Sequence, residues 1–377
     1  MMIVLGSRSR ALHANEKGTI EMQTASRMVP APPENAKESY RAGFDGLRAV
    51  AVSLVWLSHL DAIHFYNGVI GVDIFFVLSG YLITGVLAQE HAVYGRIKLP
   101  SFYARRFLRL APALWLLLVA SLLWYALESR VRPGMLGAIV ASALYFMNYN
   151  RIFHWTGEGF LGHTWSLSIE EQFYFLWPMV LVLTPRRWWL LIAAVCAASG
   201  TAWRIWLAWH DASANWIYNS LECRIDLLLL GCAVSLAGAR LHGSAATVIR
   251  RAWPLATFGL AAILFAPSGD HARAMAVMIA VVGLLSSVLI LAIESQLLAG
   301  WLISPPIVKL GRISYGVYLW HYPLLGLQSF YGFRGFWLLS NIPITLAVAA
   351  LSFRYVERPL LSVKERLVKV HGRLGTG

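Results

Sequence analysis

Two ionisable residues, Arg48 and His59, lie inside the first long apolar run of the sequence, Gly46 to Phe65. A cation or an imidazole in a membrane-buried segment is costly, so its presence there indicates a functional site. If the run is helical, the spacing brings both side chains onto one face, ~16.5 Å apart along the axis. Arg48 taken alone is more typical of a cation that snorkels to the headgroups, whereas His59 is the stronger candidate.

Three arginines, Arg105, Arg106 and Arg109, stand at the start of another apolar run, near 107–127. Arg105 and Arg109 are one helical turn apart, with Arg106 beside them. Guanidinium groups bind phosphate in a bidentate manner, so this layout suits a phosphate-bearing ligand. On charge alone, an orientation anchor at the cytosolic surface is an equally good interpretation.

The run from His163 to Tyr174 holds two adjacent carboxylates, Glu170 and Glu171. Two uncompensated acids in lipid are improbable, so at least one should face a water-filled or cationic interior. The other is compatible with an ion pair to an arginine of a neighbouring helix. The sequence does not distinguish their roles.

Asp73 and His321 add ionisable groups to two further apolar runs. At helical rise, Asp73 lies ~7 Å below the outer face, and His59 and His321 each lie ~13 Å from a membrane surface. We therefore expect these groups to converge near the middle of the membrane. A polar cluster at that depth is typical of a channel, a transporter or an intramembrane enzyme.

Composition identifies the elements that must position these groups. The chain is 58% hydrophobic and only 14% charged, with a mean hydropathy of +0.59 and 16 tryptophans. Such a chain is predicted to be an all-α polytopic membrane protein. The formal charge of +13 lies largely beside apolar runs, so nucleic-acid binding is rejected. The three cysteines have no metal-ligand spacing, so neither a zinc site nor a disulfide is expected.

Charge placement predicts the topology. Eleven apolar runs are candidates, but if all of them crossed, three basic clusters would lie outside, against the positive-inside rule. Treating the short run 135–149 as re-entrant or buried moves those clusters inside. The prediction is therefore about ten transmembrane helices, with both termini cytosolic. Residues 1–42 form a mobile cytosolic tail, 43–360 the membrane domain and 361–377 a basic cytosolic tail.

Six sequence blocks carry a resemblance to a known family. They are the Arg48–His59 spacing, FVLSGYLI at 76–83, YARRFLRLAP at 103–112, WSLSIEEQFY at 165–174, SYGVYLWHYP at 314–323 and YVERP at 355–359. In this order they resemble the acyltransferase-3 family of membrane O-acyltransferases. The resemblance implies transfer of an acyl group, usually acetyl from acetyl-CoA, to a hydroxyl of an extracytoplasmic acceptor such as a glycan or glycolipid. Some relatives carry a fused esterase-like domain, which is not expected here.

The resemblance and the depth of the charged groups together predict a mechanism. The phosphates of cytosolic acyl-CoA would bind Arg105, Arg106 and Arg109, and its pantetheine arm would run along the Arg48–His59 span. His59 would act as general base on the acceptor hydroxyl, held by Glu170 or Glu171. The cavity wall would include Asp73, Ser79, Tyr81, Trp165 and His321.

Two other classes of protein remain open. A proton-coupled transporter would use His59, Glu170 and His321 as a proton relay and the arginines to bind an anionic substrate. No internal repeat or matched pair of broken segments favours it. A membrane scaffold does not need buried acids and imidazoles on several helices. Neither the acceptor nor the acyl chain length is fixed by the sequence.

Overall fold

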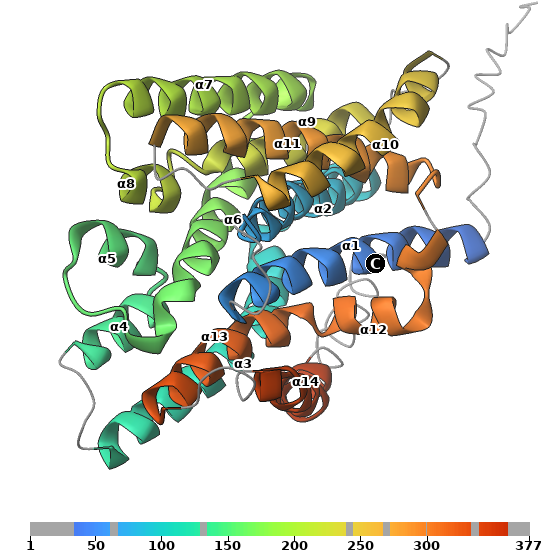
Figure 1. Cartoon of the computed structure of the whole chain (residues 1–377). Coiled ribbons are helices and arrows are strands. Elements are labelled where there is room, and N and C mark those ends of the chain that lie inside the picture. The colour runs from blue at the N-terminus through green and yellow to red at the C-terminus, as the bar shows by residue number, and fades with distance from the viewer. Residues whose placement is uncertain are drawn as a thin grey trace, which may run out of the picture.

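The computed structural model describes residues 34–60, 67–128, 134–238, 244–266, 272–298, 300–332 and 339–360, and every regular element in these ranges is a helix (Figure 1). The first half contains α1 (Glu34–Leu60), α2 (Ile70–Tyr94), α3 (Leu99–Leu127), α4 (Met135–Ala143), α5 (Met147–Phe153), η1 (Gly159–Thr164), α6 (Trp165–Leu183), η2 (Arg186–Trp188) and α7 (Trp189–Trp209). The second half contains α8 (Ala214–Asn219), α9 (Ile225–Gly238), α10 (Ser244–Phe265), α11 (Ala272–Glu294), η3 (Gly300–Ile303), α12 (Pro305–Arg312), α13 (Ser314–Phe330), α14 (Asn341–Ser352) and η5 (Phe353–Glu357).

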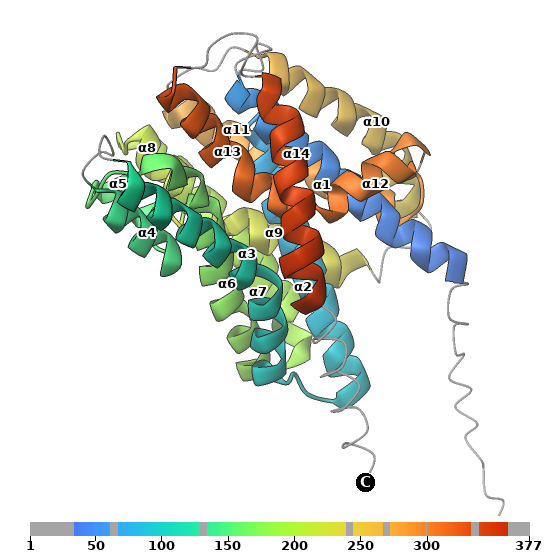
Figure 2. The ribbon, with the colours of Figure 1, turned by 90° about the horizontal axis from the view of Figure 1, so that it is seen from below.

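The helices pack in two groups. In one, α2, α7, α9, α10 and α11 lie side by side (Figure 1). In the other, α1 packs on α12 and α13, and α13 contacts α3 and α14 (Figure 2). Contacts of α1 with α2 and α11 join the two groups, and α6 packs against α2 and α9 of the first group.

Close backbone contact fixes α2 against α9. A Cβ at Gly80 would lie 1.8 Å from the Leu228 carbonyl oxygen, and one at Gly231 would lie 2.0 Å from that of Val77. Small residues let membrane helices approach closely where no hydrophobic force drives them together. Gly80, inside the block FVLSGYLI, is therefore required by packing.

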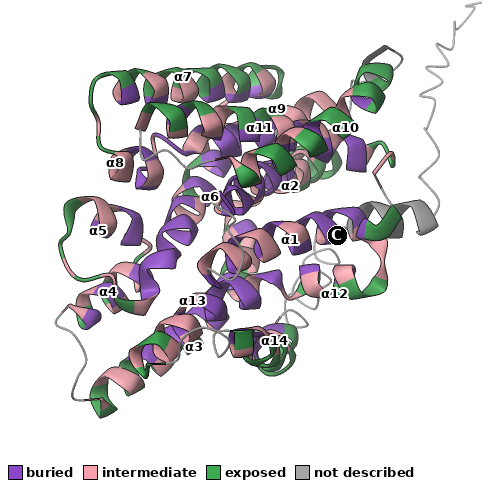
Figure 3. Cartoon of the chain, viewed as in Figure 1, coloured by how far each residue is buried: buried purple, intermediate pink, exposed green. Residues whose placement is uncertain are grey.

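The outer faces of the molecule are apolar. Exposure is concentrated on helices such as α7 and α10, whereas α6 and α9 are largely buried (Figure 3). Large side chains such as Leu255 and Phe258 on α10 are more than 70% exposed. Within the described ranges, five helices are long and apolar enough to cross a membrane: α2, α3, 186–209, 246–265 and α11. The prediction of an all-helical membrane protein is confirmed at this level.

The number of crossings stays a prediction. The run 135–149 is broken into α4 and α5, and nine-residue α4 spans only ~13.5 Å. That length is far short of a ~30 Å hydrocarbon core. The helices α9, α13 and α14 have 14, 17 and 12 residues, below the ~20 expected of a spanning helix. Helix α1 begins at Glu34, inside the expected tail, and 1–33 and 361–377 lie outside the described residues.

Candidate functional site

Two histidines from distant parts of the sequence meet at the centre of the site. The Nδ1 atom of His59, in the last turn of α1, lies 3.3 Å from Nε2 of His321 on α13. Their ring centroids are 5.2 Å apart. His321 is fully buried and His59 partly buried. The predicted convergence of His59 with His321 is therefore present in the structure.

The hydrogen-bond partners assign the tautomers of both rings. Nδ1 of His321 lies 2.7 Å from the Tyr318 carbonyl oxygen, which only accepts, so this nitrogen carries the proton. Nε2 of His321 is then an acceptor. His59 Nδ1 faces this acceptor and the Val55 carbonyl oxygen at 2.9 Å, so it is also the protonated nitrogen. The free lone pair of His59 is on Nε2, as a general base requires.

A third histidine, His163, completes the cluster from the end of η1. Its ring centroid lies 5.7 Å from that of His321 and 5.2 Å from that of Tyr322. Nε2 of His163 donates to the Leu319 carbonyl oxygen at 3.2 Å. Its Nδ1 is buried without a hydrogen-bond partner among the described residues. We use "histidine cluster" for His59, His163 and His321.

A cavity of about 160 Å³ lies where α2, α3, α6 and α13 meet, and Tyr318, which contacts His321, lines it. We call it the basic cavity, because its polar lining comes from Arg48, Arg106, Arg109, Ser79, Glu170 and Tyr318. Three arginines against one glutamate give it a positive potential. The cavity is suited to an anionic ligand.

The three arginines of α3 do not share one environment. Arg109 is exposed and makes no ion pair among the described residues. Arg106 stacks on the Tyr174 ring, with its guanidinium carbon 3.6 Å from the centroid. Arg105 instead bonds the Glu90 carboxylate at 2.8 Å and does not line the basic cavity. The expected phosphate cluster is therefore reduced to Arg106 and Arg109, joined by Arg48 from α1.

The adjacent carboxylates also separate. Glu170 lines the basic cavity and accepts a hydrogen bond of 2.5 Å from Ser79. Glu171 lies 3.7 Å from Nε of Arg106. Within the described chain, neither carboxylate bonds His59, whose ring partner is His321 instead. The sequence predicted that a glutamate holds His59 in position. In the structure the His321 imidazole contacts His59 instead.

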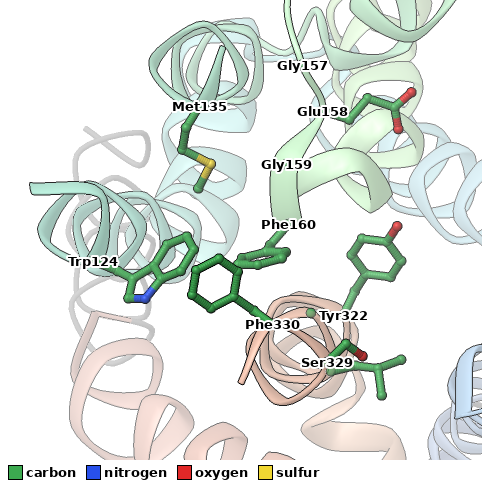
Figure 4. A pocket seen from close by; sticks show the side chains of 11 residues that line it. Trp124, Met135, Gly157, Glu158, Gly159, Phe160, Tyr322, Ser329 and Phe330 are labelled. Atoms are coloured by element: carbon green, nitrogen blue, oxygen red, sulfur yellow. The ribbon is translucent and has the colours of Figure 1, made fainter. Parts of the chain in front are cut away.

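A larger cavity, of about 640 Å³, is lined by side chains of α3, α4, η1 and α13 (Figure 4). We call it the aromatic cavity and define it by Trp124, Phe160, Phe330, Tyr322, Ser329 and Glu158. Tyr322 is one turn along α13 from Tyr318, which lines the basic cavity. His321 contacts both tyrosine rings, at 5.6 and 6.2 Å between centroids. The histidine cluster thus contacts a lining residue of each cavity, Tyr318 of the basic cavity and Tyr322 of the aromatic cavity.

The comparisons with known proteins decide the family. Residues 41–353 match the family described as "Acyltransferase domain". The chain belongs to this acyltransferase family. It is 29% identical to the peptidoglycan O-acetyltransferase OatA of Listeria monocytogenes over 350 residues, which cover 85% of this chain and 56% of that protein. It is 30% identical to the O-acetyltransferase OatA of Staphylococcus aureus over 348 residues, with 85% and 57% coverage.

The chain spans about half the length of the curated relatives it matches, including the 30% identical YrhL of Bacillus subtilis. No solved structure matches it. The resemblance to the acyltransferase-3 family is confirmed. Among the described residues, no group of three or more His, Cys, Asp or Glu has an arrangement that holds a metal ion.

Three residues that the sequence placed in the cavity wall lie elsewhere in the structure. Asp73 forms a fully buried ion pair with Arg224 of the segment before α9. Trp165 packs edge-on against Phe76 and lies 5.6 Å from the Arg224 guanidinium. Tyr81 is buried against the Phe44 ring. None of the three lines either cavity described above.

Several residues of the site were not singled out from the sequence. His163 opens the run to Tyr174 that holds the two glutamates, and its place beside the family block at 165–174 was the available signal. Tyr318 and Tyr322 flank His321 within the block at 314–323. Arg224 lies far from all six family blocks, and its pairing with Asp73 joins positions 151 residues apart. Such a long-range pairing has no signature in local spacing.

Proposed function

We propose that the protein is a membrane-embedded O-acyltransferase that moves an acetyl group from cytosolic acetyl-CoA to a hydroxyl of an extracytoplasmic cell-wall glycan. The observation that carries the proposal is that His321, which bonds His59, contacts Tyr318 of the basic cavity and Tyr322 of the aromatic cavity. A donor and an acceptor that enter from opposite sides would meet at these imidazoles. The enzyme resides in the cell membrane with both termini cytosolic.

The basic cavity is the donor side. Arg48, Arg106 and Arg109 present guanidinium groups to one small space, and coenzyme A carries several phosphates. At about 160 Å³ the cavity admits the thin pantetheine arm, while the nucleotide remains at the mouth near exposed Arg109. Arg48 and His59 lie ~16.5 Å apart along the continuous helix α1, which matches a long, narrow donor.

The histidine pair supplies acid–base chemistry. Nε2 of His59 takes the proton of the acceptor hydroxyl while the hydroxyl oxygen attacks the thioester carbonyl carbon. The imidazolium formed is stabilised at Nδ1 by the Val55 carbonyl and by the His321 lone pair. As the C–S bond breaks, the thiolate leaves and takes that proton, which yields an O-acetyl ester and free coenzyme A. His321 is therefore a positioning residue.

The acceptor assignment rests on the relatives. The Listeria monocytogenes relative is a peptidoglycan O-acetyltransferase, and peptidoglycan offers sugar hydroxyls outside the membrane. A lipid-linked glycan offers the same group. The aromatic cavity has no arginine in its lining, which suits an uncharged acceptor better than the donor phosphates.

A transfer assay tests the proposal. The purified protein in lipid nanodiscs is incubated with radiolabelled acetyl-CoA and a soluble cell-wall glycan, and base-labile acetyl on the glycan is counted. Wild type should transfer acetyl, and His59→Ala should not. The alternative, a proton-coupled transporter of an anionic substrate, would leave acetyl-CoA untouched and would instead move an anion across vesicles in response to a pH gradient.

A further inference from the structure

We infer that the aromatic cavity is the acceptor subsite and binds a pyranose ring, with one sugar face on an aromatic wall and the sugar hydroxyls on a polar wall. The inference rests on the proposed function in one respect, since it takes the His59 side of the cavity as the place where a hydroxyl reacts. The similarity to the relatives does not say where the acceptor binds.

Three rings build the aromatic wall. Trp124 comes from the end of α3, Phe160 from η1 and Phe330 from the end of α13. The Trp124 centroid lies 4.9 Å from that of Phe160 and 5.2 Å from that of Phe330, and the two phenylalanines are 6.4 Å apart. Figure 4 shows the three rings gathered on one side of the cavity. Tilted and edge-on contacts hold each ring in place.

The opposite wall is polar. It carries the hydroxyls of Tyr322 and Ser329 and the carboxylate of Glu158. Figure 4 shows the Tyr322 hydroxyl directed to the side where Glu158 lies. Glu158 is held by Arg151, with 3.2 Å between its Oε2 and the arginine Nε, and keeps a third of its side chain exposed. Donors and acceptors on this wall are matched to hydroxyl and amide groups.

The two walls together match the chemistry of a pyranose. One face of the ring presents C–H groups, which pack favourably on the negative face of an aromatic ring. Its rim presents hydroxyls, which need hydrogen-bonding partners when they leave water. A hydrocarbon chain would leave the polar wall unsatisfied. The volume of about 640 Å³ falls within the ~300–1,000 Å³ of ordinary ligand sites.

Tyr322 connects this subsite to the reacting groups. Its ring centroid lies 5.1 Å from that of His59 and 5.2 Å from that of His163. A sugar against the polar wall therefore has a hydroxyl on the His59 side of the cavity. Tyr322 is therefore the lining residue of the aromatic cavity that contacts the histidine cluster.

Gly326 keeps the aromatic wall in position. A Cβ at Gly326 would lie 2.3 Å from Cδ1 of Phe160, so any larger residue must displace that ring. Gly326 itself lines the cavity on α13. The helix can approach η1 closely only because this position has no side chain. Gly326→Ala is thus a way to move the Phe160 ring without removing it.

Binding of a defined sugar tests the inference. The probe is the disaccharide di-N-acetylchitobiose, titrated by ligand-observed NMR into the full protein in nanodiscs, because glycoside detergents would compete. Loss of one aromatic contact is worth about threefold to tenfold in Kd. Trp124→Leu, Phe330→Leu and Gly326→Ala should each weaken binding by that factor. Trp203→Leu is the matched control, since Trp203 stacks on exposed Trp206 of α7, away from the cavity.

The outcomes separate the site from the function. Wild-type binding that weakens in the three cavity variants and not in Trp203→Leu supports the subsite. No sugar binding by wild type, unchanged binding in the cavity variants, or displacement of the sugar by an equal concentration of decanol overturns it. Acetyl transfer is counted on the same preparations. Transfer from acetyl-CoA that is indifferent to Trp124→Leu defeats the subsite alone, and sugar binding without any transfer defeats the proposed function alone.

Discussion

Two groups of buried charges in this molecule differ in whether every charge has an oppositely charged partner within the protein. In the closed group, Arg204 bonds the Asp226 carboxylate at 2.6 Å, and Arg224 pairs with Asp73. No side chain of these four is more than 4% exposed. Thr201 donates to the other Asp226 oxygen at 2.6 Å.

The open group lines the basic cavity. Arg48 and Arg106 keep 22% and 15% of their side chains exposed, and Arg109 is exposed without a carboxylate partner among the described residues. Both groups place charge between membrane helices, which is costly in each case. The charges of the closed group pair with one another and hold α2, α7 and α9 together. The basic cavity is lined by more arginines than carboxylates, so the open group has positive charge left for a ligand.

The largest expected effect concerns the base next to the open group. His59→Ala should lower acetyl transfer by about 10² to 10⁴, because it removes a positioned base and little packing volume. The measurement is initial rate in nanodiscs at equal protein loading. His210→Ala, which alters an exposed histidine stacked on Trp206, is the control and should keep the wild-type rate. A fully active His59→Ala protein would show that His59 is not the base, and the open group would then have no catalytic residue beside it.

The next effect tests the closed group. Arg224→Met leaves Asp73 buried and unpaired, and breaking such a pair costs about 3–5 kcal/mol. The thermal midpoint in nanodiscs should fall by at least about 5 °C. The double variant Asp73→Asn, Arg224→Met should recover part of that loss, since no uncompensated charge remains. If the single variant is as stable as wild type, the closed group is not structural.

Local spacing predicted part of this arrangement correctly. Arg48 and His59 share the continuous helix α1, so their one-face relation follows from helical geometry. The run at 135–149 was expected to be re-entrant or buried; the structure divides it into α4 and α5, and its position in the membrane stays a prediction. These features depend on residues within one or two turns, and a sequence displays such relations directly.

Partner choice was not predictable in the same way. Asp73 and Arg48 both stand as ionisable residues in apolar runs, yet Asp73 pairs with a distant residue, Arg224, in the interior. Arg48 instead pairs with Asp45, three residues earlier, and also lines a cavity. Arg105 was grouped with Arg109 by helical phase, but its long side chain reaches back to Glu90 near the end of α2. Which partner a charge finds depends on how distant helices pack, and spacing along the chain does not encode that.

A smaller effect separates two neighbouring arginines of α3. Arg109→Gln should raise the KM for acetyl-CoA by about tenfold, since one charge-assisted hydrogen bond is worth about 1.5–3 kcal/mol. The KM for the glycan should stay unchanged. Arg105→Gln, one turn away and outside the basic cavity, is the matched control and should leave both values unchanged. Equal effects of the two substitutions would mean that the cluster acts only through its total charge.

The smallest effect is expected at the ion pair between Glu171 and Arg106 of the open group. Glu171 lies 3.7 Å from Arg106, longer than a hydrogen bond, and both side chains keep some exposure. An ion pair of that kind contributes about 0–1 kcal/mol, so Glu171→Gln should shift the thermal midpoint far less than Arg224→Met. Arg106 would still be held, because its guanidinium stacks on the Tyr174 ring independently of the carboxylate. A midpoint loss equal to that of Arg224→Met would show that Glu171 belongs to the closed group, and burial would then be a better guide to the role of a charge than the cavity beside it.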